Sequence, residues 1–160
     1  MKVALTTEEI IKYGTLGVAR CANALNVGRT GAHGFNREDD RWNIDVEGVL
    51  CEYAAAKALG IDYDPVVDGL DTHLGDLGPR LQVRGTKYPR GNLLIHDKDA
   101  DRDKFMLVTG QLGVYTLRGW IYGEDGKHQK FVRWDKTRTR WAYWVGQEWL
   151  KPVESYLAAA

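Results

Sequence analysis

The chain has 160 residues and a mass of 18.1 kDa, and 44% of its residues are hydrophobic, which suits one domain with a real core. The 22 basic residues balance 22 acidic ones, so the net charge gives no argument for a nucleic-acid-binding protein. No segment reaches the roughly 18 apolar residues of a membrane span, and the first residues do not resemble a signal peptide. We therefore expect a single cytoplasmic domain over residues 1–160 with no membrane association.

The N-terminal part of the chain has the pattern of two helices. Thr6 and Glu9 have the spacing of a capping box, and apolar residues then recur at helical spacing as far as Leu25. A second helix is predicted over residues 45–60, and it is apolar on nearly every side, as a buried helix is. Residues 28–42, which are polar and contain glycine, are predicted to form a long loop between the two helices.

After Gly60 the sequence changes to short alternating segments that are typical of strands. Residues 81–86 and 92–96, which a Pro-Arg-Gly turn separates, are predicted to form a hairpin. Further strands are predicted over residues 105–109, 114–121, 131–134 and 141–145. Helices followed by strands predict an α+β fold in which N-terminal helices pack on a mixed, mostly antiparallel sheet.

The charges are unevenly distributed along this chain. Residues 36–76 carry 3 basic and 11 acidic residues, whereas residues 77–160 carry 15 basic and 9 acidic ones. Such an asymmetry can place carboxylates beside a cationic surface, which a metal-dependent enzyme acting on phosphate-containing substrates needs. It is equally consistent with two oppositely charged solvated faces.

Glu52 is the first candidate for a functional residue, because it lies in the middle of the apolar second helix. A buried carboxylate needs a counter-charge, hydrogen bonds or a cation. If the strand over residues 81–86 packs on this helix, then Asp76, Gln82 and Arg84 could converge on Glu52. Two carboxylates and an amide oxygen are hard ligands that suit Mg²⁺, and a guanidinium group can hold a phosphate.

The order of these residues resembles the PD-(D/E)XK nuclease-like fold that occurs in small phage-encoded proteins. That fold places a glutamate on a core helix, an aspartate at the start of a strand, and a (D/E)xK tripeptide on the strand. The resemblance covers roughly residues 45–122, and it rests on the segments 48–60, 76–86, 93–95, 105–108 and 119–121. It implies a restriction-endonuclease-like core, with Glu52, Asp76, Gln82 and Arg84 as the catalytic positions. It also implies that Glu52, Asp76 and Gln82 hold Mg²⁺ or Mn²⁺, and that the protein is a metal-dependent phosphodiesterase acting on DNA.

Two positions depart from the pattern of that family. Gln82 stands where a carboxylate is usual, which lowers the negative charge offered to a metal, and Arg84 stands where a lysine is usual. The site can therefore be a degenerate remnant. The alternative function is a non-catalytic module on the same scaffold that binds nucleic acid, another protein or a second copy of the chain. A purely structural interpretation also remains, in which Glu52 and Arg84 form a buried ion pair and Gln82 satisfies backbone groups.

A segment rich in cations and aromatic residues near the C-terminus supplies candidate contacts to nucleic acid. Its cationic members are Lys127, Lys130, Arg133, Lys136, Arg138 and Arg140, and its aromatic members include three tryptophans. Cations neutralise phosphates, and aromatic faces stack on bases. The alternative is an ordinary hairpin with its tryptophans packed inward and its cations in solvent.

Other metal motifs are weaker. The aspartates of residues 97–103 imitate the start of an EF-hand loop, but Arg102 and Val108 stand where glycine and glutamate are required, so a solvated loop is expected. The four histidines lack the spacing of a zinc site. His33 or His73 could serve as a base near the acidic cluster or simply lie at the surface.

Overall fold

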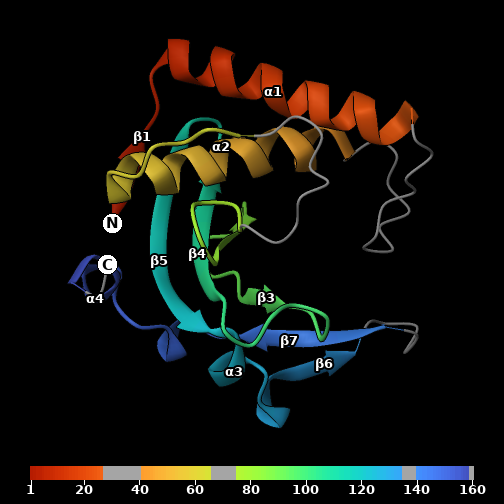
Figure 1. Cartoon of the computed structure of the whole chain (residues 1–160), viewed down its shortest axis with the longest axis vertical. Coiled ribbons are helices and arrows are strands. Elements are labelled where there is room, and N and C mark those ends of the chain that lie inside the picture. Colours follow the sequence, from red (N-terminus) through yellow and green to blue (C-terminus); the bar gives the residue numbers. More distant parts are fainter. Residues whose placement is uncertain (27–40, 66–74, 135–139, 159–160) are drawn as a thin grey trace.

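A computed structural model describes residues 1–26, 41–65, 75–134 and 140–158 of the chain. Within them lie two long helices, α1 (Thr7–Asn26) and α2 (Arg41–Leu59), and two β-sheets (Figure 1). Helix α2 lies between α1 and the larger sheet, and the smaller sheet lies at the far end of the long strands. This arrangement confirms the predicted α+β class with N-terminal helices packed on a sheet.

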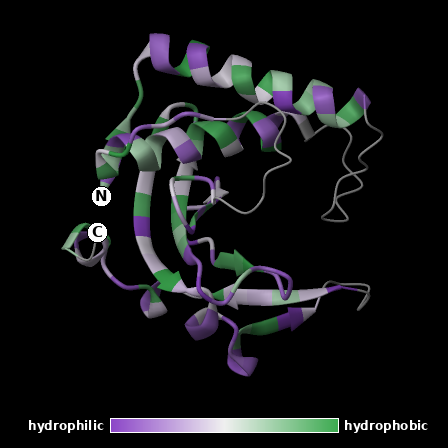
Figure 2. Ribbon diagram, in the orientation of Figure 1, coloured by the Kyte–Doolittle hydropathy of each residue, from purple (hydrophilic) through white to green (hydrophobic). Residues whose placement is uncertain are grey.

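Helix α1 begins at the predicted capping box. The Thr6 backbone N–H donates to Glu9 Oε2 at 2.7 Å, and the Glu9 backbone N–H donates to Thr6 Oγ1 at 3.2 Å. The Glu9 carboxylate also accepts from Lys57 Nζ at 2.8 Å and from the Tyr53 hydroxyl at 2.8 Å, so it ties α1 to α2. Hydrophilic and hydrophobic residues alternate along α1 in Figure 2, as in a helix that packs on one side only.

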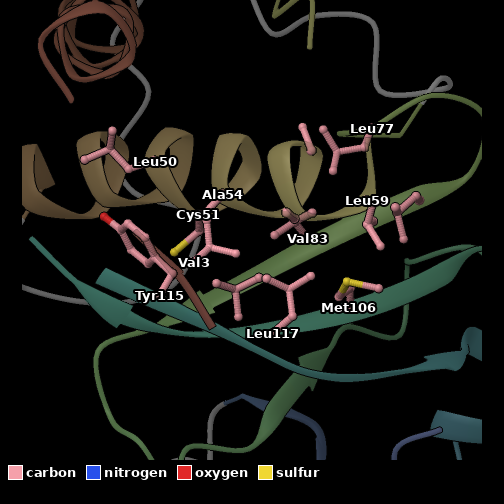
Figure 3. Packing of buried hydrophobic residues seen from close by; sticks show 14 of the residues in the cluster. Val3, Leu50, Cys51, Ala54, Leu59, Leu77, Val83, Met106, Tyr115 and Leu117 are labelled. Carbon is pink, nitrogen blue, oxygen red and sulfur yellow. The ribbon is translucent and has the colours of Figure 1, made fainter. Parts of the chain in front are cut away.

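Helix α2 begins at Arg41, four residues before the predicted Asp45, and ends at Leu59 as expected. Gly60 follows with a φ angle of 66°, and the Ile61 N–H donates to the Ala56 carbonyl at 3.0 Å. This 6→1 hydrogen bond, which closes over a glycine in the left-handed conformation, is a Schellman C-cap. The middle of α2 is buried on most sides because α1 covers one side and the sheet covers the other (Figure 3).

The larger sheet has the strand order β1-β5-β4-β2. Its strands are β1 (Lys2–Ala4), β5 (Val114–Tyr122), β4 (Lys104–Gln111) and β2 (Leu81–Thr86). Strand β5 pairs antiparallel with both β1 and β4, whereas β2 pairs with β4 in parallel. The sheet is therefore mixed and mostly antiparallel, as predicted, and β2 forms one of its edges.

The smaller sheet consists of β3 (Leu93–Ile95), β7 (Trp141–Val145) and β6 (Val132–Trp134), all antiparallel and in that order. The predicted hairpin between residues 81–86 and 92–96 is therefore wrong, because these segments belong to different sheets. A turn does lie between them, where the Gly91 N–H donates to the Tyr88 carbonyl at 2.9 Å. This turn leads the chain into the smaller sheet, where Leu93 and Ile95 are fully buried.

Strand β4 separates two hydrophobic cores. Met106 and Val108 face the core beneath α2, which Figure 3 shows, and Phe105 and Leu107 face the core of the smaller sheet. All four side chains are at most 1% exposed, which is why the strand is apolar without alternation.

Short elements complete the described chain. They are α3 (Gly123–Gly126), the 3₁₀ turns η2 (Gln129–Phe131) and η3 (Gln147–Trp149), and α4 (Val153–Ala158). Most of the loop predicted over residues 28–42, which includes His33, lies outside the described residues, and so does His73. None of the helices that the structure describes is long and apolar enough to cross a membrane.

The contacts of Glu9 predict a pH-dependent contribution to stability. The hydrogen bond from Lys57 is the main cause that lowers the pKa of Glu9 from 4.5 to about 2. A lowered carboxyl pKa stabilises the folded state above about pH 4.5, and this contribution is lost as the pH falls toward 2. We expect Glu9→Gln to lower the free energy of unfolding at pH 7 but not at pH 2, as measured by urea denaturation. Glu8→Gln, on the exposed side of the same turn, is the control, and an equal loss in both variants would contradict the assignment.

Candidate functional site

Glu52 lies in the middle of α2 with a side chain that is only 13% exposed. Its two carboxylate oxygens each accept a hydrogen bond at 3.0 Å from Nη1 of Arg20 in α1. The Tyr63 hydroxyl donates to Oε2 of the same carboxylate at 2.6 Å. A buried ion pair with an additional donor therefore satisfies Glu52, and its cationic partner is Arg20 instead of the Arg84 of the structural interpretation.

The close approach of the two helices brings Arg20 to Glu52. At Gly17, one turn before Arg20, an added Cβ atom would lie 2.5 Å from the Cα atom of Val46 in α2. A side chain at that position would force the helices apart. Glycine at position 17 therefore allows the contact through which the Arg20 guanidinium reaches the carboxylate.

Asp76 covers the free edge of β2. Its Oδ2 atom accepts the Val83 N–H at 2.7 Å, and its own backbone N–H donates to the Leu81 carbonyl at 2.8 Å. The edge strand thereby satisfies backbone groups that no neighbouring strand pairs with. The carboxylate also lies 3.8 Å from Nη1 of Arg84, so it has a partial counter-charge.

Arg84 connects Asp76 to the acidic loop formed by residues 97–103. Its Nη2 atom donates to Asp99 Oδ2 at 3.1 Å, and the guanidinium lies 5.3 Å from the centre of the Phe105 ring. Asp99 Oδ2 also accepts the His96 N–H at 2.9 Å. The acidic loop was expected to be solvated, but this aspartate is turned toward β2 because Arg84 offers it a cation.

Gln82 and Arg84 project from the face of β2 that is opposite to α2. An added Cβ atom at Gly85 would lie 2.7 Å from Cys51 Sγ of α2, so the odd-numbered residues of this strand face the helix. Gln82 Nε2 donates to Asp103 Oδ2 at 3.2 Å. The structure thus brings Glu52, Asp76 and Arg84 into one network of charges, while Gln82 is held by the acidic loop.

Burial dominates the electrostatics of the two carboxylates. Burial raises the pKa of Glu52, and the negative charge of Asp76 raises it further, although Arg20 and Tyr63 act in the opposite direction. Burial also raises the pKa of Asp76, against the lowering effect of the Val83 N–H and of Arg84. Burial therefore outweighs the cationic and hydrogen-bonding neighbours in both groups, so each carboxylate takes up a proton more readily than it would in water.

The acidic side chains of the site are its candidate ligands for a metal ion. Within the described residues, no group of three or more acidic, histidine or cysteine side chains lies together in a way that could hold a metal ion. Mg²⁺ is often bound by only one or two carboxylates, with water and substrate phosphate as its other ligands. Glu52 and Asp76 supply two carboxylates of the kind that this mode uses, each engaged by other partners, whereas the Asp97, Asp99, Asp101 and Asp103 series is spread over separate contacts.

Three residues of this network were not among the predicted site residues, namely Arg20, Tyr63 and Asp99. One signal for Arg20 was available, because it is the only cation after Lys12 in an otherwise small and apolar helical segment. The sequence gives no comparable signal for Tyr63 or Asp99, because the path of the loop that contains each residue is what brings it to the site.

The cationic candidates near the C-terminus occupy different environments. Lys127 is only 14% exposed, and its Nζ atom donates to the carbonyl of Asp97 at 2.8 Å and to that of Asp99. It also pairs with Asp101 at 2.8 Å, so it fixes the acidic loop and does not form part of an open surface. Lys130, Arg133 and Arg140 are exposed, and Lys136 and Arg138 lie outside the described residues.

The chain matches no protein-family model, no curated protein and no solved structure in the comparisons with known proteins. The functional interpretation therefore rests on the side chains described above.

The ion pair of Glu52 can be tested by a double-mutant cycle. We expect Arg20→Met to lower the free energy of unfolding by about 3 kcal/mol, because it leaves a buried carboxylate without its cation. Glu52→Gln should cost less, and the double variant should recover part of the loss of Arg20→Met. Urea denaturation at pH 7 measures all four proteins, and strictly additive effects would contradict a direct pair.

Proposed function

We propose that the protein is a divalent-metal-dependent phosphodiesterase that acts on DNA, with a PD-(D/E)XK-like, restriction-endonuclease-like core. The main support is the arrangement of Glu52 in α2 and Asp76 beside β2, two partly buried carboxylates whose negative charges interact. Arg84 lies beside Asp76, at 3.8 Å. Two carboxylates can hold a metal ion, and a neighbouring guanidinium can stabilise charge on a phosphate, so this set can support hydrolysis of a phosphodiester.

Each residue of the network has a separate task in this proposal. Glu52 and Asp76 would hold Mg²⁺ or Mn²⁺, which supplies a water of lowered pKa and neutralises phosphate charge. Gln82 donates from its amide nitrogen to Asp103, so its amide oxygen would reach the metal only if the side chain turned away from the acidic loop. A guanidinium group does not serve as a base in proteins, so Arg84 would stabilise the charge that develops on the phosphate.

Arg20 competes with the metal in this arrangement. Its Nη1 atom already bonds to both oxygens of Glu52, and none of the described residues accepts a hydrogen bond from its buried Nε atom. A substrate phosphate near the site would give this guanidinium an anion in place of Glu52. Metal and DNA are therefore expected to bind more tightly together than either does alone.

The second candidate is the non-catalytic module on the same scaffold. Two observations favour this candidate. Glu52 is bonded to Arg20, and a site that has lost its metal would retain such an ion pair. Gln82 is bonded to the acidic loop. In that case DNA, another protein or a second copy of the chain would be the partner. The exposed cations Lys130 and Arg133 would provide the contacts to nucleic acid.

Cleavage of end-labelled DNA with Mg²⁺ or Mn²⁺ tests the first candidate. The wild type should cut, and Asp76→Asn and Glu52→Gln should each lower the rate by about 10²–10³-fold, because each removes a charge from the metal site. Asp76→Asn retains an oxygen for the Val83 N–H, so the edge of β2 should remain intact. Asp125→Asn, at a surface carboxylate that is paired with Lys151 at 3.4 Å, is the matched control.

Calorimetry with Mn²⁺ and DNA retardation at two salt concentrations separate the two candidates. Cleavage that is unchanged in Asp76→Asn would refute the assignment of the site. Salt-sensitive DNA binding by a wild type that neither cleaves nor takes up metal would favour the module. Absence of both DNA and metal binding would favour a protein partner.

A further inference from the structure

The smaller sheet carries an open pocket of about 300 Å³ that is separate from the carboxylate site. The residues that matter for its chemistry are Asn92, Lys130, Arg133, Trp144, Glu148 and Trp149. Val145 and its partner Leu93 in β3 are fully buried in the core of this sheet. Because side chains alternate along a strand, Trp144 in β7 and its partner Leu94 lie on the opposite, outward face.

Trp144 offers an unoccupied aromatic surface in this pocket. Its side chain is 40% exposed, and among the described residues no other ring and no cation packs on it. Trp149 is 52% exposed, but the Lys130 Nζ atom lies 3.3 Å from the centre of its ring. Lys130 is therefore held at the wall of the pocket, and the Trp144 ring is left for a flat ligand.

Two cations in the pocket have no acidic partner within the described part of the chain. Arg133 Nη1 donates to the carbonyls of Lys130 at 3.0 Å and Val132 at 2.8 Å, which fixes the guanidinium and leaves donors on its other nitrogens. Glu148, although it lines the same pocket, forms no salt bridge with Lys130 or Arg133. Lys130 and Arg133 can thus contact one part of a ligand while Glu148 contacts another part.

We propose that this pocket binds one nucleotide of single-stranded DNA. The base stacks on Trp144, the phosphate contacts Lys130 and Arg133, and an amino group on the edge of the base donates to Glu148. A free phosphate or another simple anion would be repelled by Glu148. The bases of a duplex are stacked on one another, so only an unpaired base has a face to offer Trp144.

The choice of DNA as the ligand rests on the proposed function, but the pocket itself requires neither metal nor cleavage. The carboxylate of Glu148 also predicts a preference among bases. Cytosine presents an amino group at the position where thymine presents a carbonyl oxygen, which would face Glu148 unfavourably. Cytosine strands should therefore bind more tightly than thymine strands.

Fluorescence anisotropy of labelled oligo(dC) and oligo(dT) with the full chain in EDTA tests this inference. The wild type should bind oligo(dC) more tightly, and Trp144→Ala should weaken binding by about 5- to 100-fold. Trp144→Phe should retain most of the affinity and Trp144→Leu should not, which separates stacking from simple bulk. Glu148→Gln should reduce the difference between the two strands, because an amide can also donate to thymine.

Trp134→Ala is the matched control for stacking. Trp134 is 57% exposed and follows Arg133 in β6, so it lies on the other face of the same sheet. An equal loss in Trp134→Ala and Trp144→Ala, or no binding of either strand at low salt, would overturn the proposal, and so would tighter binding of oligo(rC). Because EDTA removes divalent metal, this affinity is measured without cleavage, so a failure of the nuclease proposal can be recognised separately in the cleavage assay.

Discussion

The carboxylate of Glu52 cannot be buried as an isolated charge, and much of the N-terminal half of the molecule is arranged around this constraint. Its cation comes from Arg20, which reaches it only because Gly17 lets α1 approach α2 closely. The hydroxyl of Tyr63 then fixes the chain that leaves α2. The packing of the two helices and the protonation of Glu52 therefore depend on each other, since a change at either helix alters the free energy of the charged carboxylate.

Strand β4 determines where the remaining charges lie. Its side chains at positions 105–108 are buried, two beneath α2 and two beneath the smaller sheet, so this stretch of the strand holds no polar site. The edge strand β2 is the neighbouring place where polar side chains can project. Asp76, Gln82 and Arg84 lie there, and the acidic loop supplies their partners Asp99 and Asp103.

The parts of the fold that depend on local sequence could be predicted, and those that depend on distant partners could not. The capping box at Thr6, the C-cap at Gly60 and the strand positions follow from side chains within a few residues. Alternation identifies residues 81–86 and 92–96 as strands, but it does not reveal which strands they pair with. The hairpin was therefore wrong although both strands exist. Arg20 and Glu52 lie 32 residues apart, and only the packing of the helices joins them.

The same contacts bear on the proposed catalysis and on the alternative in which it has been lost. The bonds from Arg20 compensate Glu52 in the absence of a metal, and they must be broken before a cation can bind to that carboxylate. Burial raises the pKa values of both Glu52 and Asp76, so each carboxylate is costly to keep charged without a counter-charge. A divalent ion would have to offset the broken bonds with its own attraction to two carboxylates, and the DNA phosphate would recover part of that cost by accepting from Arg20. The nuclease interpretation thus requires that metal and DNA bind cooperatively, whereas a binding module has no need of such coupling.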